Sequence, residues 1–232
     1  TDKKGGSSSY RTWALQFGTA ARQFAAAGIE VLNCSPASAL SCFKKWPATE
    51  ALENPSTMLH FYEKIPGWFH CEGLYRAAVA SAGKRATFIE VGAWKGKSAA
   101  FIAVEIANSG KDIEFYAVDH WKGSDEAAHR DDPDVRAGTL FETFQRNIAP
   151  VSRYVCPMKM PSVEAAATFV DGSIDFVMLD GDHSYEGVRA DIDAWLPKMK
   201  PKAVMAGDDW NWQGVQQAAT ETFGDRVQVL GE

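Results

Sequence analysis

From residue 87 onward, two patterns of hydrophobic and polar positions alternate along this chain. Short β-branched and aromatic runs, typical of buried strands, alternate with longer runs whose apolar positions recur at helical spacing. The predicted strands are residues 87–91, 113–118, 153–156, 174–179, 203–206 and 226–230, and the predicted helices between them are residues 98–108, 135–148, 162–169, 185–196 and 212–223. This alternation predicts an α/β fold: a doubly wound, mainly parallel, Rossmann-like sheet with helices on both faces.

The first third of the chain has a less regular pattern. Its apolar stretches, interrupted by prolines, predict helices at residues 10–27, 38–46, 56–62 and 72–82, and a strand at residues 29–32. We therefore predict a disordered tail at residues 1–9, an N-terminal helical cap at residues 10–70, and a ligand-binding domain at residues 71–232.

Charge and composition narrow the class of function. The chain has 232 residues, with 24 Lys and Arg against 30 Asp and Glu, a net charge of −6. An acidic chain without a basic run argues against nucleic-acid and membrane-surface binding, and no apolar run approaches the roughly 20 residues of a membrane span. There is no signal-peptide pattern, and the four cysteines lack C-x-x-C spacing. We expect a cytoplasmic protein, with a homodimer as one open possibility.

Residues 87–98 organise the domain, because they read as strand, glycine turn and helix. Gly92 and Gly96 let the backbone turn sharply, and the start of the helix offers free N–H groups to a ligand. A dinucleotide loop would read G-x-G-x-x-G, but Trp94 occupies the place of the middle glycine. Glu90 would repel pyrophosphate and suits an ammonium group, which favours S-adenosylmethionine over NAD. An ordinary strand–helix turn is the open alternative.

Polar residues directly follow the predicted strands, at the carboxyl ends where doubly wound sheets bind ligands. Asp119 can accept both hydroxyls of a ribose, and the adjacent His120 can touch the nucleoside. NAD and S-adenosylmethionine both carry that ribose, so Asp119 does not distinguish them. The alternative role for Asp119 is to cap the turn that follows the strand.

Three carboxylates, Asp180, Asp208 and Asp209, follow two further strands. They would repel one another without a counter-charge, and a hard divalent cation such as Mg²⁺ or Ca²⁺ would resolve this. Helix capping by Asp208 and solvation of Asp209 are the alternatives. His183 lies three residues after Asp180 and could take a proton from a metal-bound hydroxyl, although loop histidines are often only surface groups.

Four segments together resemble a known family. They are I-E-V-G-A-W-K-G-K-S at residues 89–98, V-D-H-W-K-G at 118–123, F-V-M-L-D-G-D-H-S-Y-E at 176–186 and M-A-G-D-D-W at 205–210. In this order they are similar to class I S-adenosylmethionine-dependent methyltransferases. Within that class they resemble the small-molecule O-methyltransferases of methyltransferase family 24, relatives of catechol O-methyltransferase and of natural-product and sugar O-methyltransferases. The resemblance covers residues 65–212 and leaves out the N-terminal third.

The resemblance implies a role for each matching residue. S-adenosylmethionine would be held by Glu90, Gly92, Ala93, Trp94, Ser98, Asp119, His120, Ser162 and Asp180, and a divalent cation such as Mg²⁺ by Asp180, Asp208 and Asp209. His183 would be the catalytic base, at a position where catechol O-methyltransferase carries a lysine. The implied reaction is methyl transfer to a hydroxyl of a small molecule such as a sugar, a glycoside or a catechol-like diol. The alternatives are a nucleotide-cofactor oxidoreductase and a non-catalytic methyltransferase-like binding module.

Overall fold

A computed structural model describes four stretches of the chain: residues 32–33, 44–45, 57–124 and 126–230. The chain divides into two units, Thr1–Leu59 and His60–Glu232. In the first unit, β1 (Leu32–Asn33) pairs in parallel with β2 (Lys44–Lys45). The helix predicted at 38–46 is therefore wrong at Lys44 and Lys45, which form a strand.

Most of the predicted N-terminal architecture lies outside the described residues. This applies to the tail at 1–9, to the helix at 10–27 and to most of the strand at 29–32. The helical cap at residues 10–70 therefore stays a prediction. Where the structure does describe this region, the helix predicted at 56–62 is wrong, because residues 57–61 are not helical and a short 3₁₀ helix, η1 (Tyr62–Lys64), follows them.

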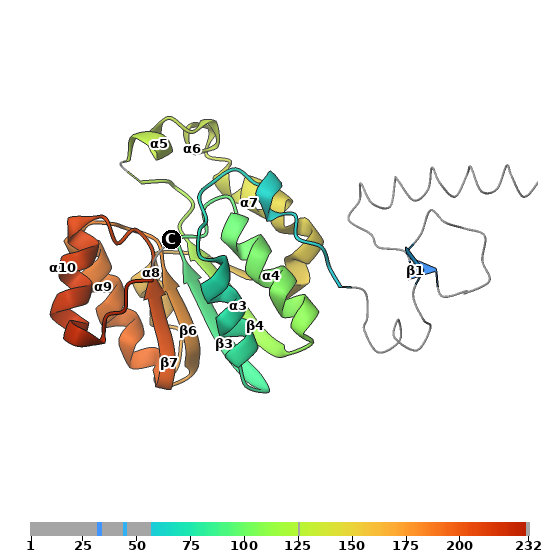
Figure 1. The fold of residues 1–232 in the computed structure, drawn as a ribbon. Helices are drawn as coiled ribbons and strands as arrows, with labels where there is room; N and C mark the ends of the chain where they lie inside the picture. The colour runs from blue at the N-terminus through green and yellow to red at the C-terminus, as the bar shows by residue number, and fades with distance from the viewer. Residues whose placement is uncertain (1–31, 34–43, 46–56, 125, 231–232) are drawn as a thin grey trace, which may run out of the picture. The chain divides into compact units, whose positions relative to one another are not determined.

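The second unit is built on a five-stranded sheet in which all strands run parallel. In spatial order the strands are β5 (Cys156–Lys159), β4 (Asp112–Asp119), β3 (Arg85–Val91), β6 (Ile174–Leu179) and β7 (Met199–Gly207) (Figure 1). The chain winds outward from β3 towards one edge and then, from β6, towards the other. Such a reversal of strand order opens a ligand crevice at the carboxyl ends of the strands. The predicted doubly wound parallel fold is confirmed.

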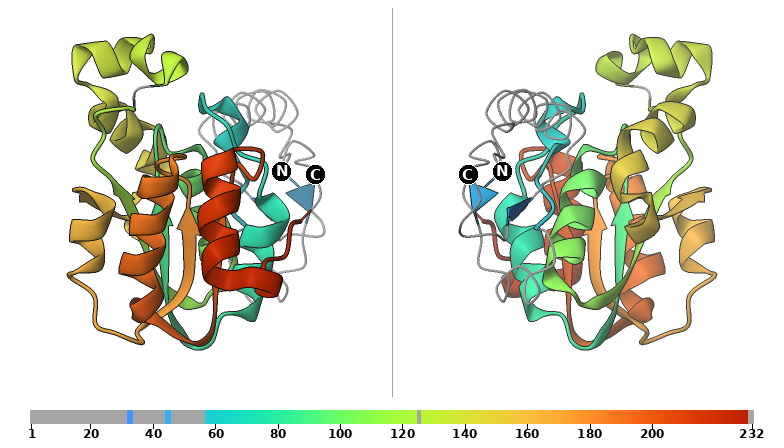
Figure 2. Two further views of the ribbon diagram at one scale, coloured as in Figure 1. Left: turned by 90° about the vertical axis from the view of Figure 1, so that its left-hand side faces the viewer. Right: turned by 90° about the vertical axis from the view of Figure 1, so that its right-hand side faces the viewer.

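Helices cover both faces of this sheet (Figures 1 and 2). One face carries α3 (Glu72–Ser81), α4 (Lys97–Ser109) and α7 (Leu140–Ile148), and the other carries α8 (Ser162–Ala166), α9 (Tyr185–Trp195) and α10 (Gln213–Phe223). Because both faces are covered, the central strand β3 is buried almost throughout. Ile89, Val177 and Trp195 meet in one core cluster between the sheet and its helices. No helix in the described part of the chain is long and apolar enough to cross a membrane.

Three other predicted elements differ from the structure. The strand predicted at 153–156 is mostly wrong, because η2 (Ala149–Tyr154) occupies that region and β5 begins at Cys156. The helix predicted at 135–148 is two helices, α6 (Pro133–Ala137) and α7, because Gly138 ends α6 in the left-handed region with φ 69°. The strand predicted at 226–230 is absent from the described residues, where η4 (Gly224–Arg226) follows α10. Two short helices, α5 (Ala127–Arg130) and η3 (Leu196–Lys198), complete the unit.

Candidate active site

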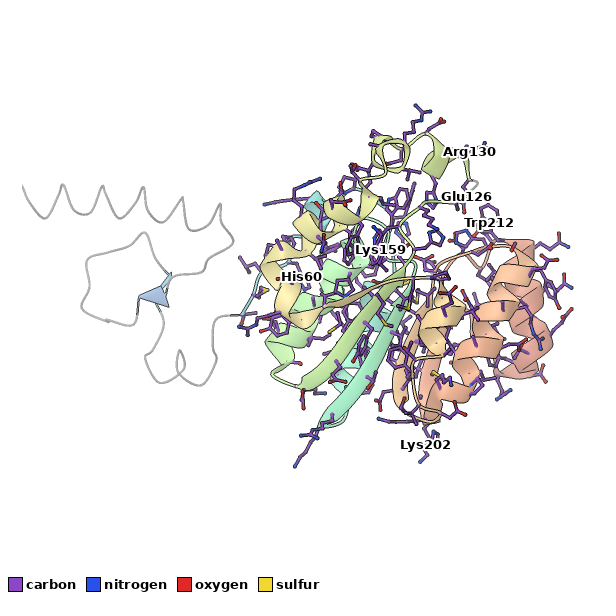
Figure 3. The ribbon with its side chains drawn as sticks, turned by 180° about the vertical axis from the view of Figure 1, so that it is seen from behind. His60, Glu126, Arg130, Lys159, Lys202 and Trp212 are labelled. Atoms are coloured by element: carbon purple, nitrogen blue, oxygen red, sulfur yellow. The ribbon has the colours of Figure 1, made fainter. Side chains whose placement is uncertain are left out.

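The carboxyl ends of four strands open onto one cavity of about 1480 Å³. Gly92, Asp119, Asp180 and Asp209 line it, each after or at the end of a different strand. Other residues predicted for the site also line this cavity: Ala93, Trp94, Ser98, His120, Ser162, His183 and Asp208. The α5–α6 segment, residues 126–137, also contributes to the cavity lining. Its Glu126 and, from the loop before α10, Trp212 both contact His183, and both are labelled in Figure 3.

Gly92 joins the two halves of the site at very close range. Its φ is +90°, and a Cβ placed there would lie 1.9 Å from the backbone oxygen of Asp180. The backbone N–H of Gly92 donates to Val118 O at 2.9 Å, and that of Asp180 donates to Val91 O at 2.9 Å. A glycine is therefore required at this position, and it fixes the loop after β3 against the loop after β6.

Glu90 lies beneath this loop rather than in the cavity wall. It is 1% exposed, and its Oε1 accepts a hydrogen bond of 2.6 Å from the Tyr75 hydroxyl. Burial raises the pKa of Glu90 to about 7, although hydrogen bonds from Tyr75 and Ser98 favour the charged form. Its Oε2 is buried and has no hydrogen-bond partner among the described residues. Glu90 is thus a carboxyl group that a nearby positive charge would stabilise.

Asp119 is tied to the backbone on both sides of the crevice. Its Oδ2 accepts from Trp94 N at 2.9 Å and its Oδ1 accepts from Trp121 N at 2.6 Å. Trp94 and Trp121 both have positive φ, 44° and 52°, and Trp121 Nε1 also donates to Trp94 O at 2.8 Å. Asp119 therefore caps the turn after β4, while each of its oxygens keeps a second lone pair for a ligand. The neighbouring His120 accepts from Lys122 N through Nδ1.

The hydroxyl of Ser162 already makes hydrogen bonds within the protein. It accepts a hydrogen bond of 2.8 Å from Trp195 Nε1. Its own proton is directed to Asp191, whose pKa burial raises to about 6 while the bond from Ser162 opposes the rise. The role of Ser162 as an adenine contact stays a prediction, and its hydroxyl has little capacity left for it.

Asp180, His183 and Asp209 form a group whose ligand atoms all lie within 4.8 Å of one another. His183 Nε2 is 2.9 Å from Asp209 Oδ2 and 3.8 Å from Asp180 Oδ1. Asp209 reaches this position with a φ of 57°. The two carboxylates supply oxygen donors of the kind that a hard divalent cation prefers, and the imidazole of His183 lies beside them.

Asp208, the third predicted metal ligand, is directed elsewhere. Its Oδ1 accepts from the backbone N–H of Asp209 at 2.8 Å, and the thiol of Cys71 lies 3.8 Å from its Oδ2. Asp208 lines the cavity but is not a member of the group above. Its role as a metal ligand stays a prediction.

The pKa shifts of Asp180 and His183 follow from burial and from the neighbouring charges. Burial, together with the charges of Asp208 and Asp209, raises the pKa of Asp180 to about 6, while the nearby imidazole of His183 opposes the rise. The carboxylate of Asp180, with the charges of Asp209 and Glu126, raises the pKa of His183 to about 9 against the effect of burial. The carboxylates therefore hold a positive charge on the imidazole, and they would hold a cation for the same reason.

Sequence reasoning missed Tyr75, Glu126 and Asp191. Tyr75 belongs to an ordinary helical pattern, and its partner Glu90 is 15 residues away. Glu126 lies in a polar stretch without periodicity and meets His183 over a separation of 57 residues. Contacts of this kind leave no local signal, whereas the strand-end residues were found because parallel strands bring their carboxyl ends together.

Comparison with known proteins gives one family. The methyltransferase family 24 model, described as a methyltransferase domain, matches residues 89–210, more than half of the chain. A curated relative, the uncharacterized protein y4gI of Sinorhizobium fredii, is 32% identical over 71 residues, which make up 29% of this chain. The matched region spans about 8% of the length of that relative.

Solved structures with similar folds are distant in sequence. A crystal structure from Staphylococcus aureus, described as that of a caffeoyl-CoA O-methyltransferase, has a TM-score of 0.49 and 12% identity, and the match covers 70% of this chain and 78% of that one. The precorrin-6y C5,15-methyltransferase of Geobacter metallireducens has a TM-score of 0.48 and 12% identity over 71% and 74%. The O-methyltransferase NovP has a TM-score of 0.47 and 17% identity over 65% and 69%.

Proposed function

The chain belongs to the methyltransferase family 24 of class I methyltransferases, and we propose that it methylates a hydroxyl group of a small molecule with the help of a divalent cation. The methyl donor of this class is S-adenosylmethionine. The observation that carries the proposal is the group of Asp180, His183 and Asp209 at the strand ends. It shares one cavity with the Gly92 loop, so a cofactor and an acceptor can meet there.

The residues around the Gly92 loop suit the methyl donor. Glu90 supplies a buried carboxyl with one unpartnered oxygen, which favours a ligand with an ammonium group above it. Gly92 and Ala93 line the cavity with the backbone of the loop after β3, and each carboxylate oxygen of Asp119 has a lone pair left to offer a ribose hydroxyl. Trp94 narrows the loop where a dinucleotide-binding chain needs glycine, so the proposal favours S-adenosylmethionine over NAD.

The acid group suits the acceptor side. Asp180 and Asp209 would hold a cation such as Mg²⁺, with Asp208 beside them, and a bound cation would lower the pKa of a substrate hydroxyl. His183 Nε2 faces these carboxylates from within reach of a hydroxyl bound there, so His183 would accept its proton. With its proton on His183, the substrate oxygen would attack the methyl group of S-adenosylmethionine; an O–CH3 bond would form as the S–CH3 bond breaks, and S-adenosylhomocysteine would leave.

A cation that bound two substrate oxygens would favour an acceptor with two neighbouring hydroxyls. A vicinal diol, as in a sugar, a glycoside or a catechol, can offer two oxygens at once. Trp212 is 43% exposed and its ring lies 5.2 Å from that of His183, so it is placed to flank such a ring. Trp68 is 63% exposed at the cavity rim, whereas Trp210 packs against the core cluster of α9 and α10. We therefore propose Trp212 and Trp68, rather than Trp210, as walls of the acceptor pocket.

Calorimetric titration tests the proposal without a known acceptor. S-adenosylmethionine and then Mg²⁺ are titrated into the wild type, into Asp209→Asn, and into the control Asp193→Asn, which removes an exposed carboxylate paired with Arg189. We expect cofactor binding in all three proteins and a Mg²⁺ signal that only Asp209→Asn lacks. Cofactor binding without any Mg²⁺ signal would contradict the metal-dependent mechanism, and absence of cofactor binding would contradict the proposed function as a whole.

A further inference from the structure

The His183 ring is held between acids on its two sides. Its Nδ1 lies 3.0 Å from Glu126 Oε1, and its Nε2 lies 2.9 Å from Asp209 Oδ2. An ionised carboxylate can only accept hydrogen bonds, so Nδ1 is the donor in the contact with Glu126. The side chain of His183 is 14% exposed, which leaves the ring little freedom to turn.

The second ring nitrogen of His183, Nε2, has no hydrogen-bond partner among the described residues. His183 Nε2 is buried and makes no well-directed hydrogen bond with the described residues, although it points towards Asp180 and Asp209. A histidine whose Nδ1 proton is held by a carboxylate presents a lone pair at Nε2 once that atom is deprotonated. The contact of Nδ1 with Glu126 leaves Nε2 as the nitrogen that faces Asp180 and Asp209.

Glu126 is itself fixed by the segment that carries it. The α5–α6 segment is anchored by Lys95, whose side chain is 8% exposed and lies 2.6 Å from Asp132 Oδ2 and 2.8 Å from Asp134 Oδ2. His129 of the same segment stacks on Trp94, with ring centroids 4.0 Å apart. Lys95 and Trp94 belong to the loop after β3, so the segment links that loop to His183.

We propose that Glu126 is a positioning residue that orients His183 for proton transfer at Nε2. The inference rests on the proposed function, in which His183 accepts the proton of the acceptor hydroxyl. Carboxylates that hydrogen-bond a metal-ligating histidine fix its tautomer and ring orientation, and their loss commonly costs about 10- to 100-fold in activity or metal affinity; we expect a loss of the same order when Glu126 no longer holds His183. The α5–α6 segment thereby contributes to the chemistry although it comes from neither strand end.

The first test observes the contact directly, without substrate. The Nδ1–H proton of His183 is followed by NMR in ¹⁵N-labelled full-length chain, with assignment by its loss in His183→Gln; the five histidines keep the spectrum simple. We expect a slowly exchanging resonance in the wild type, its loss in Glu126→Ala and its retention in Glu126→Gln, whose amide oxygen still accepts. The control Asp131→Ala, an exposed acid of the same segment, should keep it. Persistence of the resonance in Glu126→Ala would overturn the inference.

The second test separates positioning from folding. With a diol acceptor that the wild type methylates, kcat of Glu126→Ala should fall about 10- to 100-fold, KM for S-adenosylmethionine should change less than about twofold, and Glu126→Gln should recover most of kcat. Equal kcat in the wild type and Glu126→Ala would overturn the inference. If the wild type methylates nothing, the proposed function fails, and the NMR result alone then decides whether Glu126 holds the ring.

Discussion

The two halves of the site hold a buried carboxyl group in different surroundings. Near the end of β3, Glu90 is 1% exposed, receives a hydrogen bond from the neutral Tyr75, and has a pKa that burial raises to about 7. After β6 and β7, Asp180 has acidic neighbours, and an imidazole supplies positive charge between them. One half is suited to a single ammonium group, and the other to a cation of higher charge. This difference supports the proposed division of the site into a cofactor half and an acceptor half.

The largest expected effect on stability is at Gly92, where the loop after β3 contacts the loop after β6. Gly92→Ala would place a Cβ 1.9 Å from Asp180 O, so we expect a loss of more than about 4 kcal/mol in the free energy of unfolding. The matched control is Gly110→Ala, because Gly110 also has positive φ, +64°, but has nothing within 4 Å of the added atom. That change should cost only about 1–2 kcal/mol. Equal losses in urea unfolding would show that the close contact is not rigid.

Next in size is the effect of Glu90→Gln on pH dependence. The folded-state pKa of Glu90 is raised from 4.5 to about 7, so its stabilising contribution is complete below pH 4.5 and is lost as pH rises through 7. Urea unfolding of the wild type should therefore lose about 3 kcal/mol over this range relative to Glu90→Gln, since other titrating groups cancel in the difference. Parallel stability curves for the two proteins would contradict this account of the cofactor half.

A smaller loss is expected for Tyr75→Phe. It removes the 2.6 Å hydrogen bond to Glu90 in a buried site, which should cost about 1–2 kcal/mol in thermal or urea unfolding. Tyr62→Phe is the control, because the Tyr62 hydroxyl makes a longer bond of 3.2 Å to Glu72 in a partly exposed position. If the two variants lost equal stability, Tyr75 would have no special importance for Glu90.

The smallest expected effect is the release of a proton from His183 when a cation binds in the acceptor half. Because the surrounding carboxylates raise the pKa of His183 to about 9, a cation bound by them should release up to about one proton at pH 8. Calorimetric titration with Mg²⁺ in two buffers of different ionisation enthalpy measures this release. A binding enthalpy that is independent of the buffer would show that His183 and the cation do not share the same carboxylates.

The accuracy of the sequence prediction differs between the centre and the edge of the sheet. β6 matches its predicted range residue for residue, because it is a buried apolar run that ends at a strand-end acid. β5 was placed too early: it is an edge strand, and it contains Pro157, which edge strands tolerate and central strands do not. The helix broken at Gly138 was missed because its apolar pattern continues past the break.

The site divides in the same way. Strand-end reasoning placed Gly92, Asp119, Asp180 and Asp209 around one cavity because it follows from parallel topology. It could not separate Asp208 from its neighbour Asp209, since the direction of each side chain depends on the local backbone, and Asp209 has a φ of 57°. Glu126 was also beyond reach, because its position depends on how the α5–α6 segment packs.

Methyl transfer itself tests the central claim most directly. Formation of S-adenosylhomocysteine is measured with a panel of catechol, sugar and glycoside diols, with Mg²⁺ or with a chelator, for the wild type and Asp209→Asn. The account predicts product with at least one diol and loss of that product both with chelator and in the variant. Methylation that survives both treatments would contradict a role for the acid group in the reaction.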